Sequence, residues 1–322
     1  MLYPEISFTL VNYHIFHNSY IFFKYYGTIV YSQQRERGFM KKKIDHVKIL
    51  LDALPYIKRY SDEIFVIKYG GSAQITPELK EKFSRDIVLM YLVGIKPVIV
   101  HGGGRAIGEM LDRLQIGSHF IDGLRVTDEK VMEVVEMVLS GSINKEITDL
   151  LNEHGAPALG VSGKDASMLK AKPVDMQKYG YVGAITEVDP KAINNLISEK
   201  FIPVIAPVAT GQRSGHPGFN INADIAAGHI AASLKARKII FMTDTPGVMD
   251  HKKEIIHTLN ENQIGLLKVQ GVISGGMIPK VDACLNAVHG GVMKAHIIDG
   301  RIEHALLLEV FTSEGIGTVI KL

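Results

Sequence analysis

The sequence has little of several features that mark particular classes of protein. It contains one cysteine, Cys284, and no tryptophan among its 322 residues. A single cysteine rules out a disulfide within the chain, and no cysteine–histidine spacing resembles a structural zinc site. We therefore expect a reducing, cytoplasmic location, with Cys284 as a small core residue rather than a nucleophile.

An excess of charge of either sign is also missing. The chain has 36 basic and 34 acidic residues, which gives a formal net charge of +2. Such a balance provides no basic surface for nucleic acids or anionic membranes, so we expect neither as a partner. At 46% hydrophobic and 22% charged residues, the composition is that of a globular protein. The length suffices for one large α/β domain or two lobes.

Residues 1–39 differ from the rest of the chain. They hold eleven of the 24 phenylalanines and tyrosines, and residues 6–23 carry no charged side chain. Histidines and asparagines interrupt this run, and no basic start or small-residue cleavage site is present, which argues against a membrane span or a secretory signal. Three interpretations stay open: translated upstream sequence or a cleaved segment ahead of Met40, a disordered arm, and a membrane-associated segment.

From residue 40 onward, helical and extended patterns alternate. Residues 40–61 predict an amphipathic helix with a kink or break at Pro55. Thr76 is expected to cap the next helix, and Thr127 the long helix that Gly155 ends. Residues 168–188 read as a hairpin-like excursion. The repeated strand–loop–helix units predict an α/β fold.

The common nucleotide-binding motifs are absent. There is no Walker loop, and "GGGRAIG" does not fit G-x-G-x-x-G because its sixth position is Ile107. We therefore exclude a P-loop enzyme and a Rossmann dehydrogenase. Four other stretches should lie at the carboxyl ends of strands, where open α/β sheets bind ligands: "KYGG", "HGGG", "TDTPG" and "SGGMIPK".

Two lysines in these stretches are candidates for phosphoryl transfer. That chemistry needs positive charge around the migrating group and rigid N–H donors. Lys68 and Lys280 each lie near a glycine pair. Asp224 in "NINAD" is placed to orient the two ammonium groups. The alternatives are solvated surface lysines and, for "NINAD", simple helix capping.

Other polar residues are candidates for holding a substrate. The guanidinium of Arg125 suits a carboxylate, and a salt bridge to Asp122 or Asp128 is the alternative. Asn220 is a second candidate ligand. His101 ends a predicted strand, where a structural histidine is the better interpretation than a general base.

Several motifs together resemble the acetylglutamate kinases of the amino acid kinase family. They run from about Lys43 to Leu322 in the family's order and spacing: "IKYGG", "HGGG", "GLRVTDEK", "FNINADIAAG", "TDTPGV" and "GGMIPKVDACLNAVHGG". The pair "RVTD" and "NINAD" separates these kinases from the aspartate, carbamate and uridylate kinases. The resemblance implies a three-layer sandwich with a mostly parallel central sheet. Its two lobes would be residues 62–195, for acetylglutamate, and 196–322, for ATP.

The resemblance also implies a reaction and its site. ATP would phosphorylate the side-chain carboxylate of N-acetyl-L-glutamate in L-arginine biosynthesis, with Mg²⁺ held mainly by the ATP phosphates and no protein metal site. Lys68, Lys280 and Asp224 would be catalytic. Substrate would contact Gly71, Gly103, Gly104, Arg125 and Asn220. Nucleotide would contact Thr243, Asp244, Gly247, Val248, Ser274, Gly276 and Met277. Another acyl acceptor, or a non-catalytic arginine-sensing subunit, is the alternative.

Two further features resemble the arginine-inhibited members. The helix at 40–61 looks like the one that links dimers into a hexamer, so we expect a homo-oligomer, dimer or hexamer. His296, Glu309 and Gly315 fall on positions that contact the inhibitor L-arginine, although Glu309 is alternatively an ordinary surface charge. Two departures stand out: Arg105 replaces the usual proline after "HGGG", and Pro246 replaces an acidic or small residue.

Overall fold

The computed structural model describes residues 43–44, 47–74, 76–211 and 216–322. The chain divides into two compact units, Met1–Pro55 and Tyr56–Leu322. Residues 47–60 are helical with Pro55 included, so the helix is not interrupted there, and the kink stays a prediction. Among the described helices, none is both long and apolar enough to cross a membrane. The expectations for residues 1–39 lie outside the described residues.

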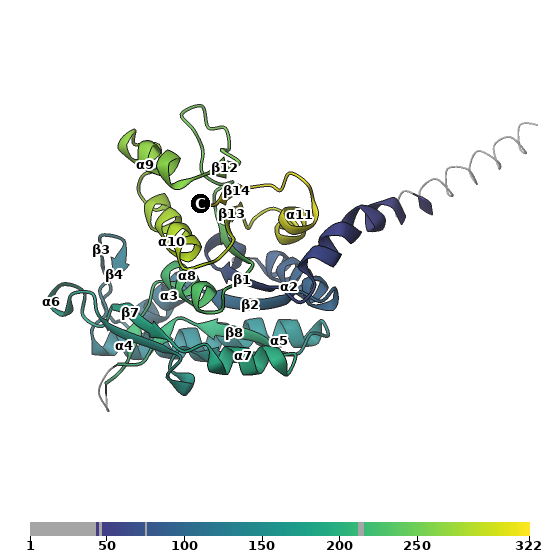
Figure 1. Ribbon diagram of the computed structural model, residues 1–322. Coiled ribbons are helices and arrows are strands. Elements are labelled where there is room, and N and C mark those ends of the chain that lie inside the picture. Colours follow the sequence, from purple (N-terminus) through teal and green to yellow (C-terminus); the bar gives the residue numbers. More distant parts are fainter. Residues whose placement is uncertain (1–42, 45–46, 75, 212–215) are drawn as a thin grey trace, which may run out of the picture. The chain divides into compact units, whose positions relative to one another are not determined.

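The second unit is built on one eight-stranded sheet (Figure 1). Its strand order is β12-β14-β13-β11-β1-β2-β8-β5, and every neighbouring pair is parallel except β13 and β14. The strands are β1 (Ile64–Tyr69), β2 (Lys96–His101), β5 (Ala158–Ser162), β8 (Ile202–Ala206), β11 (Lys238–Thr243), β12 (Thr258–Leu259), β13 (Lys294–Asp299) and β14 (Thr318–Ile320). The predicted mostly parallel sheet is confirmed.

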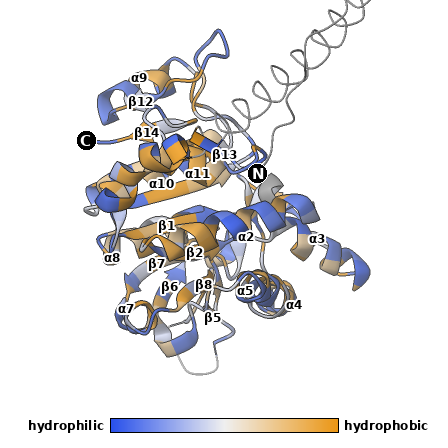
Figure 2. Cartoon of the chain, turned by 90° about the vertical axis from the view of Figure 1, so that its right-hand side faces the viewer, coloured by the Kyte–Doolittle hydropathy of each residue, from blue (hydrophilic) through white to orange (hydrophobic). Residues whose placement is uncertain are grey.

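Both faces of this sheet are buried, as a parallel sheet requires. Successive residues of a strand point to opposite faces. In β1, Phe65 and Ile67 therefore join one hydrophobic cluster, and Val66 joins the other. Figure 2 shows the hydrophobic residues concentrated along β1, β2 and helix α10. Near-continuous apolar strands of this kind have no polar face for solvent.

Helices cover each face and complete the three layers. Helices α2 (Pro77–Leu92), α3 (Gly104–Arg113), α4 (Glu129–Glu136), α5 (Asn144–Glu153) and α11 (Ala305–Phe311) supply one cluster. Helices α7 (Lys191–Ser198), α8 (Ala223–Ser233), α9 (Glu261–Val269) and α10 (Met277–His289) supply the other. The predicted layered α/β architecture is confirmed. Strand β8, from the predicted ATP lobe, lies between β2 and β5 of the predicted acetylglutamate lobe. The lobe boundary at residues 195–196 stays a prediction.

Helix ends follow the capping signals with one exception. Thr76 caps α2 by accepting a hydrogen bond from the Leu79 amide, as predicted. The cap of α4 is Asp128, which accepts from the Val131 amide, so the prediction of Thr127 was wrong. The Thr127 hydroxyl donates instead to the Arg125 carbonyl. A π-helical segment, η2 (Met137–Ile143), joins α4 to α5 and was not predicted.

Small hairpins and short helices make up the remaining elements. Strands β6 (Leu169–Pro173) and β7 (Gly183–Val188) pair antiparallel, so the predicted excursion at residues 168–188 is confirmed. Two shorter antiparallel pairs are β3 (Phe120–Ile121) with β4 (Leu124–Arg125) and β9 (Val208–Ala209) with β10 (Phe219–Asn220). The short helices are η1 (Gly71–Gln74), η3 (Asp165–Ser167) and α6 (Met176–Tyr179).

Candidate active site

The sheet brings the glycine-rich stretches to one edge. Strands β1, β2 and β11 are parallel neighbours, and they end at Tyr69, His101 and Thr243. The glycine loop after β2 is bonded to the end of β1, since the Gly102 amide donates to the Tyr69 carbonyl at 2.8 Å. Ligands of open α/β proteins bind at such an edge.

A buried ion triad lies at this edge. The Nζ of Lys68, from β1, is 2.9 Å from Oδ1 of Asp224 at the start of α8. The Nζ of Lys280, from α10, is 2.9 Å from Oδ2 of the same carboxylate. Lys68 is 8% exposed and Asp224 is 6% exposed. Lys68 is therefore not a solvated surface lysine, and the Lys280 side chain is 20% exposed.

The carboxylate between the lysines is held in its charged form. Burial alone would raise the pKa of Asp224, but the charges of Lys68 and Lys280 outweigh it, so the pKa lies below its usual value. Asn222 caps α8 by accepting from the Asp224 and Ile225 amides. The cap is thus the neighbouring asparagine, which leaves the Asp224 side chain for the lysines.

A missing side chain makes room for one ammonium group. A Cβ on Gly70 would lie 3.2 Å from Nζ of Lys68 and would crowd it. The next residue, Gly71, has φ of +64°, a conformation that favours glycine. The turn and the lysine position therefore depend on the same glycine pair.

A small cavity of about 180 Å³, the acceptor cavity, gathers most of the predicted substrate ligands. Gly103, Gly104, Arg125 and Asn220 all line it. Gly71 does not: the structure places it on the wall of a neighbouring cavity. The acceptor cavity is also lined by residues 222–223, which directly precede Asp224. A ligand held by Arg125 and Asn220 therefore lies next to the ion triad.

Arg125 is held in place by hydrogen bonds, and its charge is not neutralised by the carboxylates that were its predicted alternative partners. Its guanidinium donates to the Gly104 carbonyl at 2.7 Å and to Ser118 Oγ at 2.6 Å. It also lies 4.6 Å from the ring centre of Phe120, a contact that sequence reasoning missed. Asp122 pairs with Lys178 instead. The positive charge of Arg125 is thus available to an anionic ligand.

A second cavity of about 420 Å³ opens beside α10. Its lining includes every predicted nucleotide residue: Thr243, Asp244, Gly247, Val248, Ser274, Gly276 and Met277. Lys280 lines it too, so this lysine belongs to the cavity and to the ion triad. The Oγ1 of Thr245 is buried in the same wall with no hydrogen-bond partner among the described residues. It is a further polar group for a ligand.

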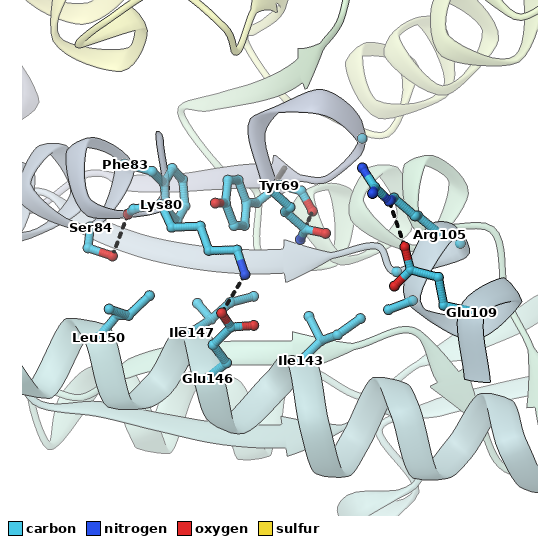
Figure 3. Close-up of a pocket in the computed structure, with 15 residues that line it drawn as sticks. Tyr69, Lys80, Phe83, Ser84, Arg105, Glu109, Ile143, Glu146, Ile147 and Leu150 are labelled. Carbon is cyan, nitrogen blue, oxygen red and sulfur yellow. Dashed lines mark hydrogen bonds and ion pairs between the residues drawn. The ribbon is translucent and has the colours of Figure 1, made fainter. Parts of the chain in front are cut away.

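A third cavity, of about 390 Å³, adjoins the glycine loop on another side (Figure 3). Its cations are already paired, Lys80 with Glu146 and Arg105 with Glu109. Because both positive charges are neutralised, this cavity has no charge for an anionic substrate. The unusual Arg105 therefore forms an exposed i,i+4 ion pair, beside the glycine loop rather than within it.

The three predicted arginine-contacting residues also come together, beside β13. His296 Nδ1 is 2.6 Å from Oε1 of Glu309, and both side chains are buried. The other oxygen of Glu309 accepts from the amides of Ile316 and Gly317. A Cβ on Gly315 would lie 2.7 Å from that oxygen. Glu309 is therefore not an ordinary surface charge.

The protonation of this pair leaves one nitrogen without a partner. Burial lowers the pKa of His296. Burial alone would raise the pKa of Glu309, but the hydrogen bond from His296 outweighs it, so the pKa of Glu309 is also lowered. A neutral imidazole thus donates from Nδ1 to a carboxylate. The lone pair of Nε2 has no hydrogen-bond partner among the described residues. Lys238, which sequence reasoning missed, adds positive charge near Glu309.

Sequence comparison assigns the family. Residues 63–299 match the model of the amino acid kinase family. The chain belongs to this family. An acetylglutamate kinase from a Nitratiruptor species is 65% identical over 281 residues, 87% of this chain and 99% of the relative. Another from Sulfurimonas denitrificans is 63% identical with the same coverage. The resemblance seen in the motifs is confirmed, and with it a phosphotransferase.

Solved structures agree with the fold. An N-acetylglutamate synthase from Neisseria gonorrhoeae, complexed with coenzyme A and N-acetyl-glutamate, superposes with a TM-score of 0.74 at 26% identity. The match covers 86% of this chain and 63% of that one. A carbamate kinase from Giardia lamblia bound to AMP-PNP has a TM-score of 0.62 at 17% identity, covering 81% and 99%. The second likeness supports the fold alone.

Proposed function

We propose that the chain transfers the γ-phosphoryl group of ATP to the side-chain carboxylate of N-acetyl-L-glutamate. The product is N-acetyl-L-glutamyl 5-phosphate, an acyl phosphate of L-arginine biosynthesis. One observation carries the proposal: the buried triad of Lys68, Asp224 and Lys280 connects the cavity of Arg125 and Asn220 with the cavity beside α10. The relatives named acetylglutamate kinase support the same substrate.

The chemistry requires charge and position more than proton transfer. A carboxylate oxygen of the acceptor attacks the γ-phosphorus, the bond to the β,γ-bridging oxygen breaks, and ADP leaves with that electron pair. The attacking carboxylate is already ionised at neutral pH, so no general base is required. Lys68 and Lys280 counter the repulsion between the two anionic substrates and stabilise the charge of the transition state.

Arg125 orients the acceptor in this scheme. Its guanidinium has five N–H donors, of which the bonds to Gly104 and Ser118 use two. The remaining donors bind the α-carboxylate, while Asn220 and the Gly103 and Gly104 amides hold other polar groups. This arrangement directs the side-chain carboxylate toward the triad.

Mg²⁺ is assigned to the nucleotide rather than to the protein. Among the described residues no group of three or more His, Cys, Asp or Glu side chains is arranged to hold a metal ion. The carboxylate of Asp224 is occupied by two lysines. When bound, Mg²⁺ would neutralise charge on the ATP phosphates. This chain's own contribution there is Lys280 and the loop from Thr243 to Val248.

A coupled ADP-release assay tests the substrate. N-acetylglutamate, glutamate and aspartate are compared at equal concentration, with an acceptor-free reaction as control. We expect N-acetylglutamate to give a kcat/KM at least 10²-fold above that of glutamate, because glutamate lacks the N-acetyl group and leaves the polar groups that bind it without a partner. Equal rates with glutamate or aspartate would assign another acyl acceptor, and no acceptor-dependent ADP would favour a non-catalytic subunit.

We further propose feedback inhibition by L-arginine at His296, Glu309 and Gly315. The Nε2 lone pair of His296 is a buried acceptor that lacks a donor within the described chain, and arginine carries only donors on its guanidinium. Both Glu309 oxygens are already engaged, so arginine would have to replace one of those bonds. Turnover unaffected by millimolar arginine would refute this regulation.

We also propose that the chain is a homo-oligomer. Within the first unit, four apolar residues of the helix are 49–59% exposed and fall at amphipathic spacing: Ile44, Val47, Leu51 and Leu54. Such a face requires a partner surface. Light scattering distinguishes monomer, dimer and hexamer, and a monomer at micromolar concentration would contradict the proposal.

A further inference from the structure

A histidine with no assigned role lies at the base of the substrate-side glycine loop. His101 is the last residue of β2, and its side chain is fully buried. Gly102, Gly103 and Gly104 follow it and line the acceptor cavity. A buried imidazole is costly unless both ring nitrogens have partners. The partners therefore show what the ring holds in place.

Both nitrogens of His101 are engaged, and the geometry selects one tautomer. Nδ1 is 3.1 Å from the Gly102 carbonyl oxygen, which only accepts, so Nδ1 carries the proton. Nε2 is 3.2 Å from Nδ2 of Asn144 and must accept from it. Nδ2 also lies 2.9 Å from the Val204 carbonyl oxygen and 3.2 Å from that of Val161. Its two hydrogens therefore serve three acceptors, with one N–H shared between two of them, and the two carbonyls keep the amide nitrogen directed to this side.

Burial agrees with a neutral ring. It lowers the pKa of His101 to about 4. A protonated ring would direct a second N–H at the Asn144 amide, which is itself a donor in that direction. The ring is therefore held in one tautomer and one orientation at neutral pH.

The position of Asn144 depends on two neighbouring features. It follows the π-helical segment η2 directly, as the first residue of α5. A Cβ on Gly160 would lie 2.0 Å from Asn144 Oδ1, so only glycine in β5 leaves space for the amide. The same π segment also contacts the loop, since a Cβ on Gly103 would lie 2.3 Å from Ile143 Cδ1 and 2.7 Å from Leu139 Cδ2. Ile143 is visible in Figure 3.

A planar peptide carries this constraint to the acceptor cavity. The Gly102 carbonyl and the Gly103 N–H belong to one rigid unit and point in opposite directions. A hydrogen bond that draws the carbonyl toward the imidazole therefore directs the Gly103 N–H away from it. Glycine has no side chain to restrict its dihedrals, so an external bond is needed to select one orientation.

We propose that His101 and Asn144 are positioning residues that fix the Gly102–Gly103 peptide, so that the Gly103 N–H donates to the bound acceptor. The proposal rests on the proposed function for the identity of that acceptor. Neither residue touches substrate. Their removal weakens acceptor binding and leaves the nucleotide cavity, which none of these contacts reaches, as it was.

The test compares binding of the two substrates by calorimetry. His101→Ala and Asn144→Ala should each raise the Kd for N-acetylglutamate about tenfold, while the Kd for a non-hydrolysable ATP analogue stays within twofold. His101→Asn keeps an amide nitrogen near the Nδ1 position, so its acceptor Kd should stay within threefold of the parent value. An acceptor Kd unchanged in both alanine variants overturns the proposal, and so does a parallel loss of both ligands.

Asn152→Ala is the matched control. Asn152 also lies on α5 and makes two side-chain hydrogen bonds to the backbone of Ala158 in β5, but it has no contact with the glycine loop. The Asn152→Ala variant should be less stable than the parent and should keep the parent's affinity for the acceptor. An equal loss of acceptor affinity in this variant shows a general effect of α5 and overturns the positioning role.

A second readout does not depend on substrate or on the folding of the alanine variants. In protein labelled with ¹⁵N-histidine, the His101 signal, identified by its absence from His101→Asn, should show a neutral ring protonated at Nδ1 at pH 7. A ring protonated at Nε2 overturns the proposal. If the parent neither binds nor phosphorylates N-acetylglutamate, the proposed function fails, and the tautomer still decides the geometry.

Discussion

Two buried carboxylates lie against different strands of the same mostly parallel sheet, each with basic groups around it. At the carboxyl end, Asp224 lies between Lys68 and Lys280. On the other side of β11, Glu309 lies against His296 of β13, with the charge of Lys238 nearby. Strand β11 separates the two clusters, because it pairs with β1, which carries Lys68, and with β13, which carries His296.

The two clusters differ in access and in what is left unbonded. Lys280 lines the large cavity beside α10, and the acceptor cavity adjoins Asp224, so the first cluster faces two ligand sites. The second cluster is closed, and the Nε2 of His296 remains without a partner in the described chain. Positive charge next to cavities suits catalysis, whereas a buried pair with an unmet acceptor suits binding of a regulator. The predictions below separate these roles.

The largest effect is expected from the lysines at the carboxyl end. Lys68→Ala and Lys280→Ala should each lower kcat by about 10²-fold or more, because each removes a charge that stabilises the migrating phosphoryl group. Steady-state ADP release measures it. Lys268→Ala, which breaks an ion pair with Asp282 across α9 and α10, is the control and should change kcat less than threefold. If neither variant of the pair slows turnover tenfold, the assignment is wrong.

A smaller loss is expected when the carboxylate between the lysines is neutralised. Asp224→Asn leaves two ammonium groups that repel each other, a cost of about 2–3 kcal/mol at the effective dielectric of a protein site. The lysines then separate, and kcat should fall about 30-fold. Asp282→Asn on α10 provides the control. Activity equal to the parent would mean that Asp224 does not set the lysine positions.

The buried histidine His101 allows a test by pH. The pKa of His101 is about 4 in the folded state, below the value of about 6.5 when unfolded, so the unfolded chain binds the extra proton as pH falls. Stability from this residue is therefore present above pH 6.5 and is lost as pH falls toward 4. Between pH 6.5 and pH 5 the loss is about 2 kcal/mol.

Urea unfolding of the parent and of His101→Asn measures this difference. Asp86 acts in the opposite direction, because burial raises its pKa to about 6 and stability from it falls as pH rises through that range. Both proteins share Asp86, so subtraction of their pH profiles isolates His101. Parallel profiles would show that His101 is not buried in its neutral form.

The smallest effect is expected at the pair of His296 and Glu309. Glu309→Gln weakens the bond from His296 and removes the negative charge that a guanidinium requires. The arginine concentration for half-inhibition should rise about tenfold. A fall in kcat as large as that of the lysine variants, or an unchanged arginine response, would contradict the separation of the two clusters.

Much of this molecule is predictable from its sequence. The strand–loop–helix units indicated the α/β fold, the family resemblance implied the mostly parallel sheet, and the capping signal at Thr76 located the start of α2. The π-helical segment was missed because "VLSGSINKE" continues an ordinary helical pattern. Two of its side chains, Leu139 and Ile143, lie against Gly103, a contact that no local pattern shows. The sequence also could not show that Gly71 lines the neighbouring cavity and not the acceptor cavity, because which wall a glycine lines depends on tertiary packing. Its contact with substrate stays a prediction.

The partners of single polar residues were the least predictable. Asn144 and Gly160 are sixteen residues apart, and nothing local shows that one fits against the other. The alternative partners of Arg125 were wrong because Asp122 pairs with Lys178 and Asp128 caps α4. Such pairings depend on which elements the fold brings together rather than on spacing along the chain.

Trapping of the acyl phosphate tests the central claim most directly. The protein is incubated with ATP, Mg²⁺, N-acetylglutamate and hydroxylamine, and the acyl hydroxamate is measured against ADP. We predict one hydroxamate for each ADP in the parent and at least a 10²-fold lower rate in Lys68→Ala and Lys280→Ala. ADP released without hydroxamate, or hydroxamate formed at the parent rate by both variants, would contradict the account.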